Sequence, residues 1–166
     1  MSVCEFLFLD EEKLDVFLPK LFEILHSNMS LIAPTGNSYN EDFEIWKSNI
    51  IPTMQKGDHK VVLMYVSGSL AGYFNYFINL DTNTLMMADI QIKKQFQGTG
   101  LFSRMYKWLI KKLPRNLLYV EAYANKNNYK SQSVLKHLGL VESGENKNGI
   151  SYYYKGEFSN LLSRYT

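Results

Sequence analysis

One stretch, residues 88–110, constrains the fold of this chain more than any other. It begins with an extended apolar run, passes through a turn that carries Gly98 and Gly100, and continues with apolar residues at helical spacing, such as Leu101 and Met105. The pattern predicts a strand, a tight turn and a helix. Because glycine has no side chain, the two glycines let the backbone adopt left-handed angles and let a ligand approach closely.

The turn is suited to an anion because the helix after it leaves its first backbone amides without intrahelical partners. Those amides point into the turn and carry the positive end of the helix dipole. Phosphate is the anion most often found in such turns. Gln97 adds a neutral donor, and Lys93 and Lys94 add positive charge close by. We therefore predict a phosphate-bearing ligand here.

Two general phosphate-binding signatures can be set against this turn. The nucleoside-triphosphate loop requires a lysine directly after its last glycine, and in this chain Leu101 follows Gly100, so that loop is excluded. The dinucleotide fingerprint Gly-x-Gly-x-x-Gly has Ser103 in place of its third glycine, while Glu121 lies at about the right distance for a ribose-binding acid. A dinucleotide-binding protein is therefore the second hypothesis, although the chain shows a single strand-helix-strand unit where that fold needs several.

The turn resembles the acyl-coenzyme A loop of the GCN5-related N-acetyltransferases, the GNAT family. Against the family's common form, Arg-Gly-x-Gly-Ile/Leu-Gly, residues 97–102 read Gln-Gly-Thr-Gly-Leu-Phe, so Phe102 replaces a small residue. A register that starts at Gln95 matches the looser pattern Gln/Arg-x-x-Gly-x-Gly/Ala but would misplace the apolar face of the helix. Residues 128–140 independently resemble the family's later segment, Asn-x-x-Ala/Ser-x-x-Leu/Val-Tyr/x-x-x-Leu-Gly-Phe.

This resemblance implies a single acetyltransferase domain over residues 1–166, of the α/β (α+β) class. It implies a mixed, mostly antiparallel central sheet of about seven strands, with helices on both faces and a splayed acyl-CoA cleft. It also implies acetyl-coenzyme A as cosubstrate. The residues expected to bind the coenzyme lie on the strand, the loop and the later helix, and are Ile90, Gln91, Ile92, Gln97, Gly98, Thr99, Gly100, Leu101, Phe102, Asn128 and Ser131.

The implied reaction is direct transfer of an acetyl group to an acceptor amine within a ternary complex. Its rate would come from holding the amine and the thioester together, and from an amide hydrogen of residues 90–92 that faces the oxygen on which negative charge develops. The alternative role is an acyl-CoA-binding sensor or an inactive domain of the same fold, and Phe102 in the loop keeps this alternative open. A small amine, an antibiotic, a polyamine, an amino acid and a protein amine all remain open as acceptors.

Proton transfer is where the chain departs most from the family. The family often places a tyrosine four residues before the glycine of the second motif to protonate the departing thiolate, and here that residue is Leu135. Tyr129 or Tyr123 could replace it. The base that removes a proton from the acceptor ammonium is expected to be Asp89 or Glu121, the carboxylates nearest to the inferred site in sequence.

Composition narrows the other possibilities. The 166 residues are 46% hydrophobic, enough for one domain with a core, and a net charge of +2 without a basic stripe predicts no nucleic-acid partner. Three scattered histidines and the single Cys4 lack metal-ligand spacing, so no metal is expected. No apolar stretch approaches membrane-spanning length and no signal peptide is recognised. We expect a cytoplasmic monomer or homodimer without a membrane partner.

The remaining patterns predict the order of elements around the central stretch. A helix capped by Asp10 should be kinked or broken at Pro19, and the helix after the glycine turn should be closed by Pro114. Strands are expected over residues 3–9, 59–66, 70–80, 84–93, 117–124, 140–143 and 150–155, and further helices over residues 41–50 and 128–138.

Overall fold

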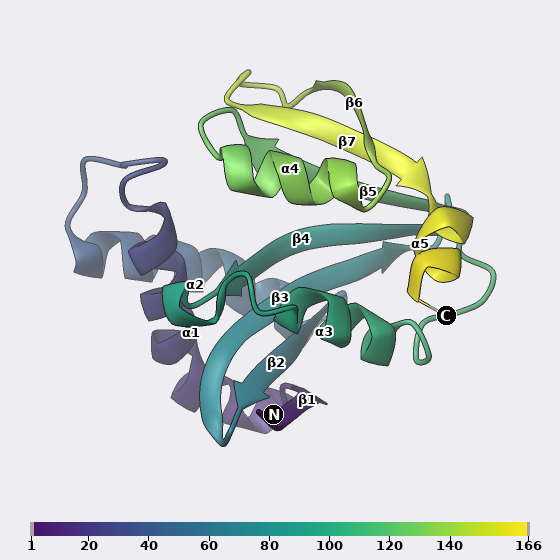
Figure 1. Cartoon of the computed structure of the whole chain (residues 1–166). Coiled ribbons are helices and arrows are strands. Elements are labelled where there is room, and N and C mark those ends of the chain that lie inside the picture. Colours follow the sequence, from purple (N-terminus) through teal and green to yellow (C-terminus); the bar gives the residue numbers. More distant parts are fainter. Residues whose placement is uncertain (1, 166) are drawn as a thin grey trace. The chain divides into compact units, whose positions relative to one another are not determined.

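The computed structural model describes residues 2–165, and within them seven strands form one sheet in the order β1-β2-β3-β4-β5-β7-β6 (Figure 1). The strands are β1 (Cys4–Phe8), β2 (His59–Val66), β3 (Ser69–Asn79), β4 (Thr84–Ile92), β5 (Tyr119–Asn125), β6 (Val141–Glu145) and β7 (Ser151–Glu157). The helices are α1 (Leu14–Met29), α2 (Tyr39–Gln55), α3 (Leu101–Leu109), α4 (Tyr129–His137) and α5 (Phe158–Tyr165), with short 3-10 helices η1 (Glu11–Lys13) and η2 (Lys94–Phe96).

Pairing in the sheet is mixed and mostly antiparallel. β1 pairs antiparallel with β2, and β7 pairs antiparallel with both β5 and β6. β4 and β5 pair in parallel, from Thr84 opposite Tyr119 to Met87 opposite Ala122. The predicted fold class, a mixed α/β architecture around an open sheet, is therefore confirmed.

Contacts between Cα atoms divide the chain into two compact units. The first contains Met1–Asn75 and Asp89–Leu101, and the second contains Tyr76–Ala88 and Phe102–Thr166. β3 and β4 each contribute residues to both units. The expectation that residues 1–166 form one domain stays a prediction.

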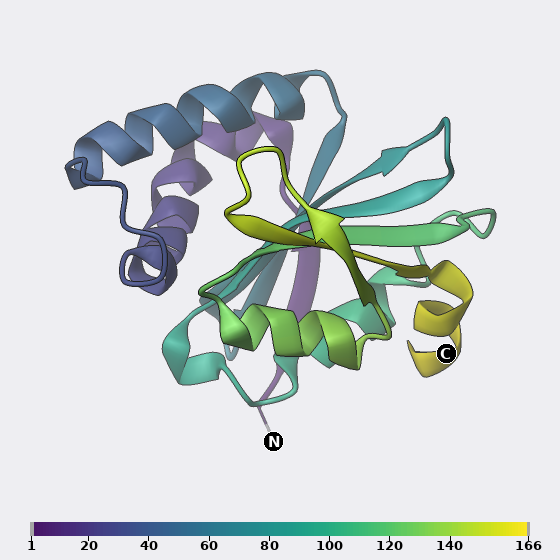
Figure 2. The same ribbon diagram turned by 90° about the horizontal axis from the view of Figure 1, so that it is seen from above.

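In the first unit, α1 and α2 lie side by side, as Figure 2 shows. Asp10 caps η1, because its side chain accepts a hydrogen bond from the Glu12 amide at 3.1 Å. Ser38 caps α2 in the same way through the Glu41 amide at 3.2 Å. The helices pack on the strands through a shared apolar core that consists of Leu9, Leu14, Leu18, Leu21, Ile50, Met54, Val61, Leu63 and Tyr73.

Of the two outcomes expected at Pro19, the break is wrong, since α1 continues from Leu14 to Met29, and the kink stays a prediction. A proline inside a helix costs about 3 kcal/mol because it removes one hydrogen bond and crowds the preceding turn. Buried residues lie on both sides of it, with Leu18 before Pro19 and Leu21 after it. Each buried leucine contributes roughly 1.5–3 kcal/mol, so packing along the helix offsets the loss.

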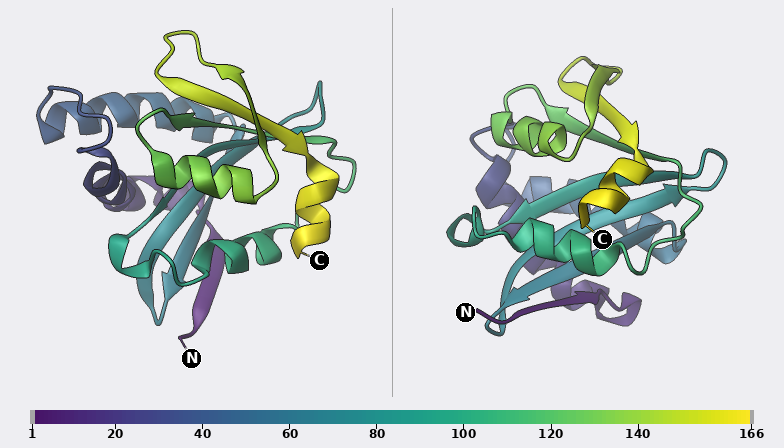
Figure 3. Two further views of the ribbon diagram at one scale, coloured as in Figure 1. Left: turned by 45° about the horizontal axis from the view of Figure 1, so that its top comes forward. Right: turned by 45° about the vertical axis from the view of Figure 1, so that its right-hand side comes forward.

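In the second unit, α4 lies beside β5 and β6 (Figure 3). Its final helix, α5, follows β7 directly and was not predicted from the sequence. The segment is only eight residues long, but Phe158 and Leu161 are buried and the ring of Tyr165 stacks on Tyr106 at 5.6 Å. Tertiary packing therefore stabilises a helix that is too short to be stable alone.

The end of α3 also differs from the prediction. The helix ends at Leu109, several residues before Pro114. The chain turns instead through a hydrogen bond from the Lys112 amide to the Leu109 carbonyl at 2.8 Å, and Leu113 is buried after the turn. The helix therefore ends in a turn before Pro114, and Pro114 does not terminate it.

Candidate active site

The glycine turn has the backbone that its sequence predicts. It connects η2 to α3, and Gly98 and Gly100 have φ angles of 74° and 81°. A Cβ atom placed on either glycine would meet no heavy atom within 4 Å. Glycine is therefore required by the left-handed backbone, and the space beside both residues is open to a ligand.

Side chains of the turn brace its own backbone. The Thr99 hydroxyl donates to the Phe96 carbonyl at 2.6 Å, and the Gln97 side-chain amide donates to the Ile92 carbonyl at 2.9 Å. Gln97 was expected to face a phosphate; this bond ties it to the last residue of β4. Because α3 begins at Leu101, the turn leads directly into a helix N-terminus, where the first amides have no partner within the helix.

Leu101 and Phe102 have packing roles at the start of α3. Leu101 is buried, and the half-buried ring of Phe102 makes an edge contact with Tyr106 one turn later, with 4.6 Å between ring centroids. The Tyr106 hydroxyl in turn donates to the sulfur of Met87. The replacement of the family's small residue by Phe102 is therefore accommodated by an aromatic pair along α3.

Asp89 lies in β4 within a network of hydrogen bonds. Its Oδ2 accepts from the Tyr73 hydroxyl at 2.6 Å and its Oδ1 accepts from Gln91 Nε2 at 2.8 Å. Burial raises the pKa of Asp89 above its ordinary value, while the bonds from Tyr73, Gln91 and the Ile90 backbone oppose that rise. Burial first, and the Asp89 carboxylate second, hold the pKa of Tyr73 well above its ordinary value.

Asn28, which the sequence analysis missed, joins α1 to the end of β4. Its Nδ2 donates to Gln91 Oε1 at 3.0 Å and to the Ile92 carbonyl at 2.9 Å. Asn28 is more than 60 residues away from both partners, and no local pattern indicates the contact. Tyr73 was missed for the same reason, since only the pairing of strands brings it to Asp89.

Gly72 shows how closely β3 approaches this part of β4. A Cβ atom on Gly72 would lie 2.4 Å from the carbonyl oxygen of Gln91, a distance that no real side chain tolerates. Next to it, the Lys93 amide donates to the Ala71 carbonyl at 2.8 Å. Glycine is required at this position because the two backbones are in contact.

Glu121, the second candidate base, lies on β5 in the second unit. Its Oε1 is 3.7 Å from Nζ of Lys155 on the neighbouring strand. Burial first, and hydrogen bonding and charge from Glu121 second, raise the pKa of Tyr153. Tyr123, the other tyrosine considered as an acid, is exposed and lies 5.3 Å from Tyr153 between ring centroids. The Glu121 carboxylate thus lies beside Lys155 and interacts with Tyr153.

The second motif forms the start of α4. Asn128 caps this helix, and its side-chain oxygen accepts from the Ser131 amide at 3.1 Å, so the structure brings these two predicted residues together. Tyr129 is the first helical residue and is 73% exposed, which leaves its hydroxyl available to a ligand. Leu135 is buried in the core, and its side chain cannot donate a proton.

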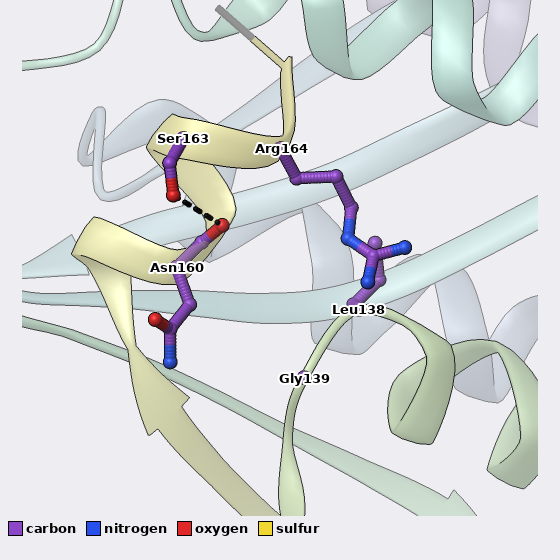
Figure 4. A pocket seen from close by; sticks show the side chains of 5 residues that line it. All are labelled: Leu138, Gly139, Asn160, Ser163 and Arg164. Carbon is purple, nitrogen blue, oxygen red and sulfur yellow. Dashed lines mark hydrogen bonds between the residues drawn. The ribbon is translucent and has the colours of Figure 1, made fainter.

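A hollow of about 440 Å³ in the second unit contains none of the predicted site residues (Figure 4). It lies between the turn after α4 and helix α5, and Figure 4 shows the side chains of Asn160 and Arg164 extending from α5. Its lining residues are Leu138, Gly139, Asn160, Ser163 and Arg164.

Within residues 2–165, no three His, Cys, Asp or Glu side chains come together in a group that could hold a metal ion. None of the helices in the same range combines the length and the apolar character that crossing a bilayer requires.

Comparison with known proteins identifies the family of this chain. The sequence model described as the acetyltransferase (GNAT) family matches residues 18–140, which include both motifs and the strands between α2 and the glycine turn. The chain belongs to the GNAT acetyltransferase family. No curated protein sequence matches it.

Solved structures of GNAT proteins share the fold over nearly the whole chain. The PaiA N-acetyltransferase from Thermoplasma acidophilum, solved in complex with coenzyme A, has a TM-score of 0.67 and 17% identity, covering 93% of this chain and 99% of that one. An acetyltransferase from Thermus thermophilus has a TM-score of 0.69 and 13% identity, covering 95% of this chain and 99% of that one.

A mutant of the spermidine N-acetyltransferase SpeG from Vibrio cholerae has a TM-score of 0.65 and 16% identity, covering 98% of each chain. At these identities the similarity shows the fold. Together with the family match, it makes this GNAT protein an acetyltransferase.

Proposed function

We propose that this GNAT protein transfers an acetyl group from acetyl-coenzyme A to an acceptor amine by direct attack in a ternary complex. The observation that carries the proposal is the glycine turn. Gly98 and Gly100 both have left-handed backbone angles and open space beside them, and the turn leads into the N-terminus of the helix that begins at Leu101, a position that favours anions.

The residues of the chain fit the coenzyme by the chemistry of their donors. The backbone of residues 97–101 and the first turn of α3 would hold the pyrophosphate, which backbone amides recognise well. Lys93 and Lys94 supply positive charge just before the turn. Asn128 and Ser131 are assigned to the pantetheine and pyrophosphate by their place in the second motif. When bound, acetyl-coenzyme A supplies the activated acetyl group as a thioester.

Backbone amides of Ile90–Ile92 are assigned to the developing negative charge on the acetyl oxygen. Fixed donors of this kind accelerate acyl transfer because they need no reorganisation when the charge appears. The hydrogen bonds around Asp89 and Gln91 restrain this segment before any ligand arrives. These side-chain bonds support the assignment of the segment to this role.

Asp89 is the favoured base for the acceptor ammonium. A base works best when its pKa lies near the working pH, and burial shifts the pKa of Asp89 in that direction. Glu121 is the second candidate, and its Oε1 lies 3.7 Å from Nζ of Lys155. Tyr129 is assigned to protonation of the departing thiolate. A thiol of pKa about 8.5 leaves readily as thiolate, so this assistance contributes less than the base.

A thermal-shift comparison tests the coenzyme. Acetyl-coenzyme A at a hundred times its dissociation constant should stabilise the protein by about 2.7 kcal/mol, whereas NAD, NADP and ATP should not. Stabilisation by a dinucleotide but not by coenzyme A would overturn the assignment.

An acceptor panel tests the reaction. Release of free thiol from acetyl-coenzyme A is followed with small amines, polyamines, aminoglycosides, amino acids and peptides. Thiol release that depends on one class of amine supports the transferase. Tight coenzyme binding without release by any amine would instead support a sensor.

A further inference from the structure

The carbonyl oxygen of Ile92, the last residue of β4, accepts two side-chain hydrogen bonds, one from α1 and one from the glycine turn. Asn28 Nδ2 on α1 donates at 2.9 Å, and Gln97 Nε2 in the glycine turn donates at 2.9 Å. One peptide oxygen therefore connects a helix, a strand and the turn assigned to the pyrophosphate. All three lie within the first unit.

The Asn28 amide is fully used as a donor. It also donates to Gln91 Oε1 at 3.0 Å, and this oxygen belongs to the side chain whose Nε2 donates to Asp89. Gln91 itself is buried. A continuous path of hydrogen bonds thus runs from Asn28 through Gln91 to Asp89 and ends at Tyr73.

The path fixes the orientation of the Gln91 side chain. Its oxygen must face the Asn28 donor, so its nitrogen must face the Asp89 carboxylate, and reversal of the amide would place two like groups together at both ends. Buried polar groups that lose a partner are costly, so each bond supports the next. Loss of the Asn28 donor would therefore also weaken the hydrogen bond between Gln91 and Asp89.

We propose that Asn28 is a positioning residue for acetyl transfer, which acts together with Gln97 by holding the last peptide of β4 and with it the amides of Ile90–Ile92. The inference rests on the proposed function. Asn28 holds the segment from α1 and Gln97 holds it from the turn. Since both bonds end on one oxygen, the effect of losing either donor depends on whether the other is present.

The decisive variant is Asn28→Asp. It keeps the size and shape of the side chain but removes both N–H donors and directs a carboxylate oxygen at the Gln91 and Ile92 oxygens. Asn28→Ala removes the side chain, and Gln97→Ala removes the second donor. Asn146→Ala is the matched control, because Asn146 also makes a side-chain bond to backbone, from the Ser151 amide at 3.0 Å in the β6–β7 turn.

Turnover is measured with saturating acetyl-coenzyme A and the best amine, well below the melting temperature of each variant. Because small misplacements of reacting groups cost up to about 100-fold, we expect Asn28→Asp to lower kcat about 10-fold with KM for the amine within about twofold. Asn146→Ala should leave both unchanged. In the double variant with Asn28→Ala and Gln97→Ala, the fold-loss of kcat should differ from the product of the fold-losses of the two single variants.

A carbonyl ¹³C NMR measurement provides a readout that needs no activity. Both Asn28→Asp and Gln97→Ala should shift the Ile92 carbonyl resonance and speed hydrogen exchange of the Lys93 amide in the ligand-free protein, and Asn146→Ala should do neither. An unchanged Ile92 resonance in Asn28→Asp would overturn the proposal, as would a kcat equal to that of the control.

These outcomes separate the two proposals. If the wild-type protein releases no thiol with any amine, the proposed function fails, and the role of Asn28 in positioning for acetyl transfer fails with it. The NMR result then still decides whether Asn28 holds the Ile92 peptide. If the wild-type protein is active and Asn28→Asp is equally active, only the positioning role is refuted.

Discussion

Replacement of the turn glycines by alanine should separate coenzyme binding from stability. Gly98 and Gly100 have φ angles of 74° and 81°, and an added Cβ would meet no heavy atom within 4 Å in either case. The cost of alanine is therefore conformational alone, roughly 1–2 kcal/mol per residue. For a chain of this size the melting temperature should fall by about 2–8 °C, and the protein should stay folded.

Gly68→Ala is a closely matched control. Gly68 has a φ angle of 82°, an added Cβ would also meet nothing within 4 Å, and the residue lies in the turn between β2 and β3. Its loss of stability should equal that of Gly100→Ala. If the backbone at the turn approaches a phosphate, only Gly98→Ala and Gly100→Ala should also lose affinity for the coenzyme. Calorimetry should show a loss of about 10-fold or more, which corresponds to about 1.4 kcal/mol of binding free energy.

The comparison has a clear refuting result. Equal coenzyme affinity in Gly98→Ala, Gly100→Ala and Gly68→Ala would mean that the turn glycines serve the backbone only. Circular dichroism on each variant establishes that the comparison is made on folded protein. Gly72→Ala can replace neither the turn variants nor the control, because its Cβ would collide with the Gln91 backbone.

Three other changes test the base, its alternative and the core. Asp89→Asn should lower turnover at neutral pH, and the loss of turnover should be smaller at high pH, where the free amine is abundant. A pH-rate profile at saturating coenzyme checks this, and a profile identical to that of the wild type contradicts it. The pKa of Asp89 is higher in the folded state than in the unfolded state, so the folded state holds this proton more tightly. The free energy of unfolding of the wild-type protein should therefore fall as the pH rises from the unfolded-state pKa through the folded-state pKa. Urea unfolding of Asp89→Asn should lack this fall. Glu121→Gln should show the same turnover pattern if Glu121 is the base, and should lower the pKa of Tyr153 in any case, which ultraviolet titration measures. Leu63→Ala, at a fully buried core position, should cost about 2–5 kcal/mol in urea unfolding, and a loss below about 1 kcal/mol would contradict the assigned packing.

The sequence by itself determined the elements whose signals are local. The glycine turn, the helix that begins at Leu101 and the cap at Asn128 depend on backbone angles and hydrogen bonds between residues a few positions apart. Both family motifs consist of such local features, which is why the fold class and the family were predicted correctly. Most strands were also found, because their apolar runs are bounded by turn residues.

Only the tertiary structure decided the features that depend on distant partners. The apolar core kept α1 continuous through Pro19, and contacts of Phe158, Leu161 and Tyr165 stabilised α5. The same holds for Asn28, whose two acceptors lie more than 60 residues away. A side-chain amide has no sequence signature for its partner, because its bonds depend on which backbone groups folding brings within about 3 Å of it.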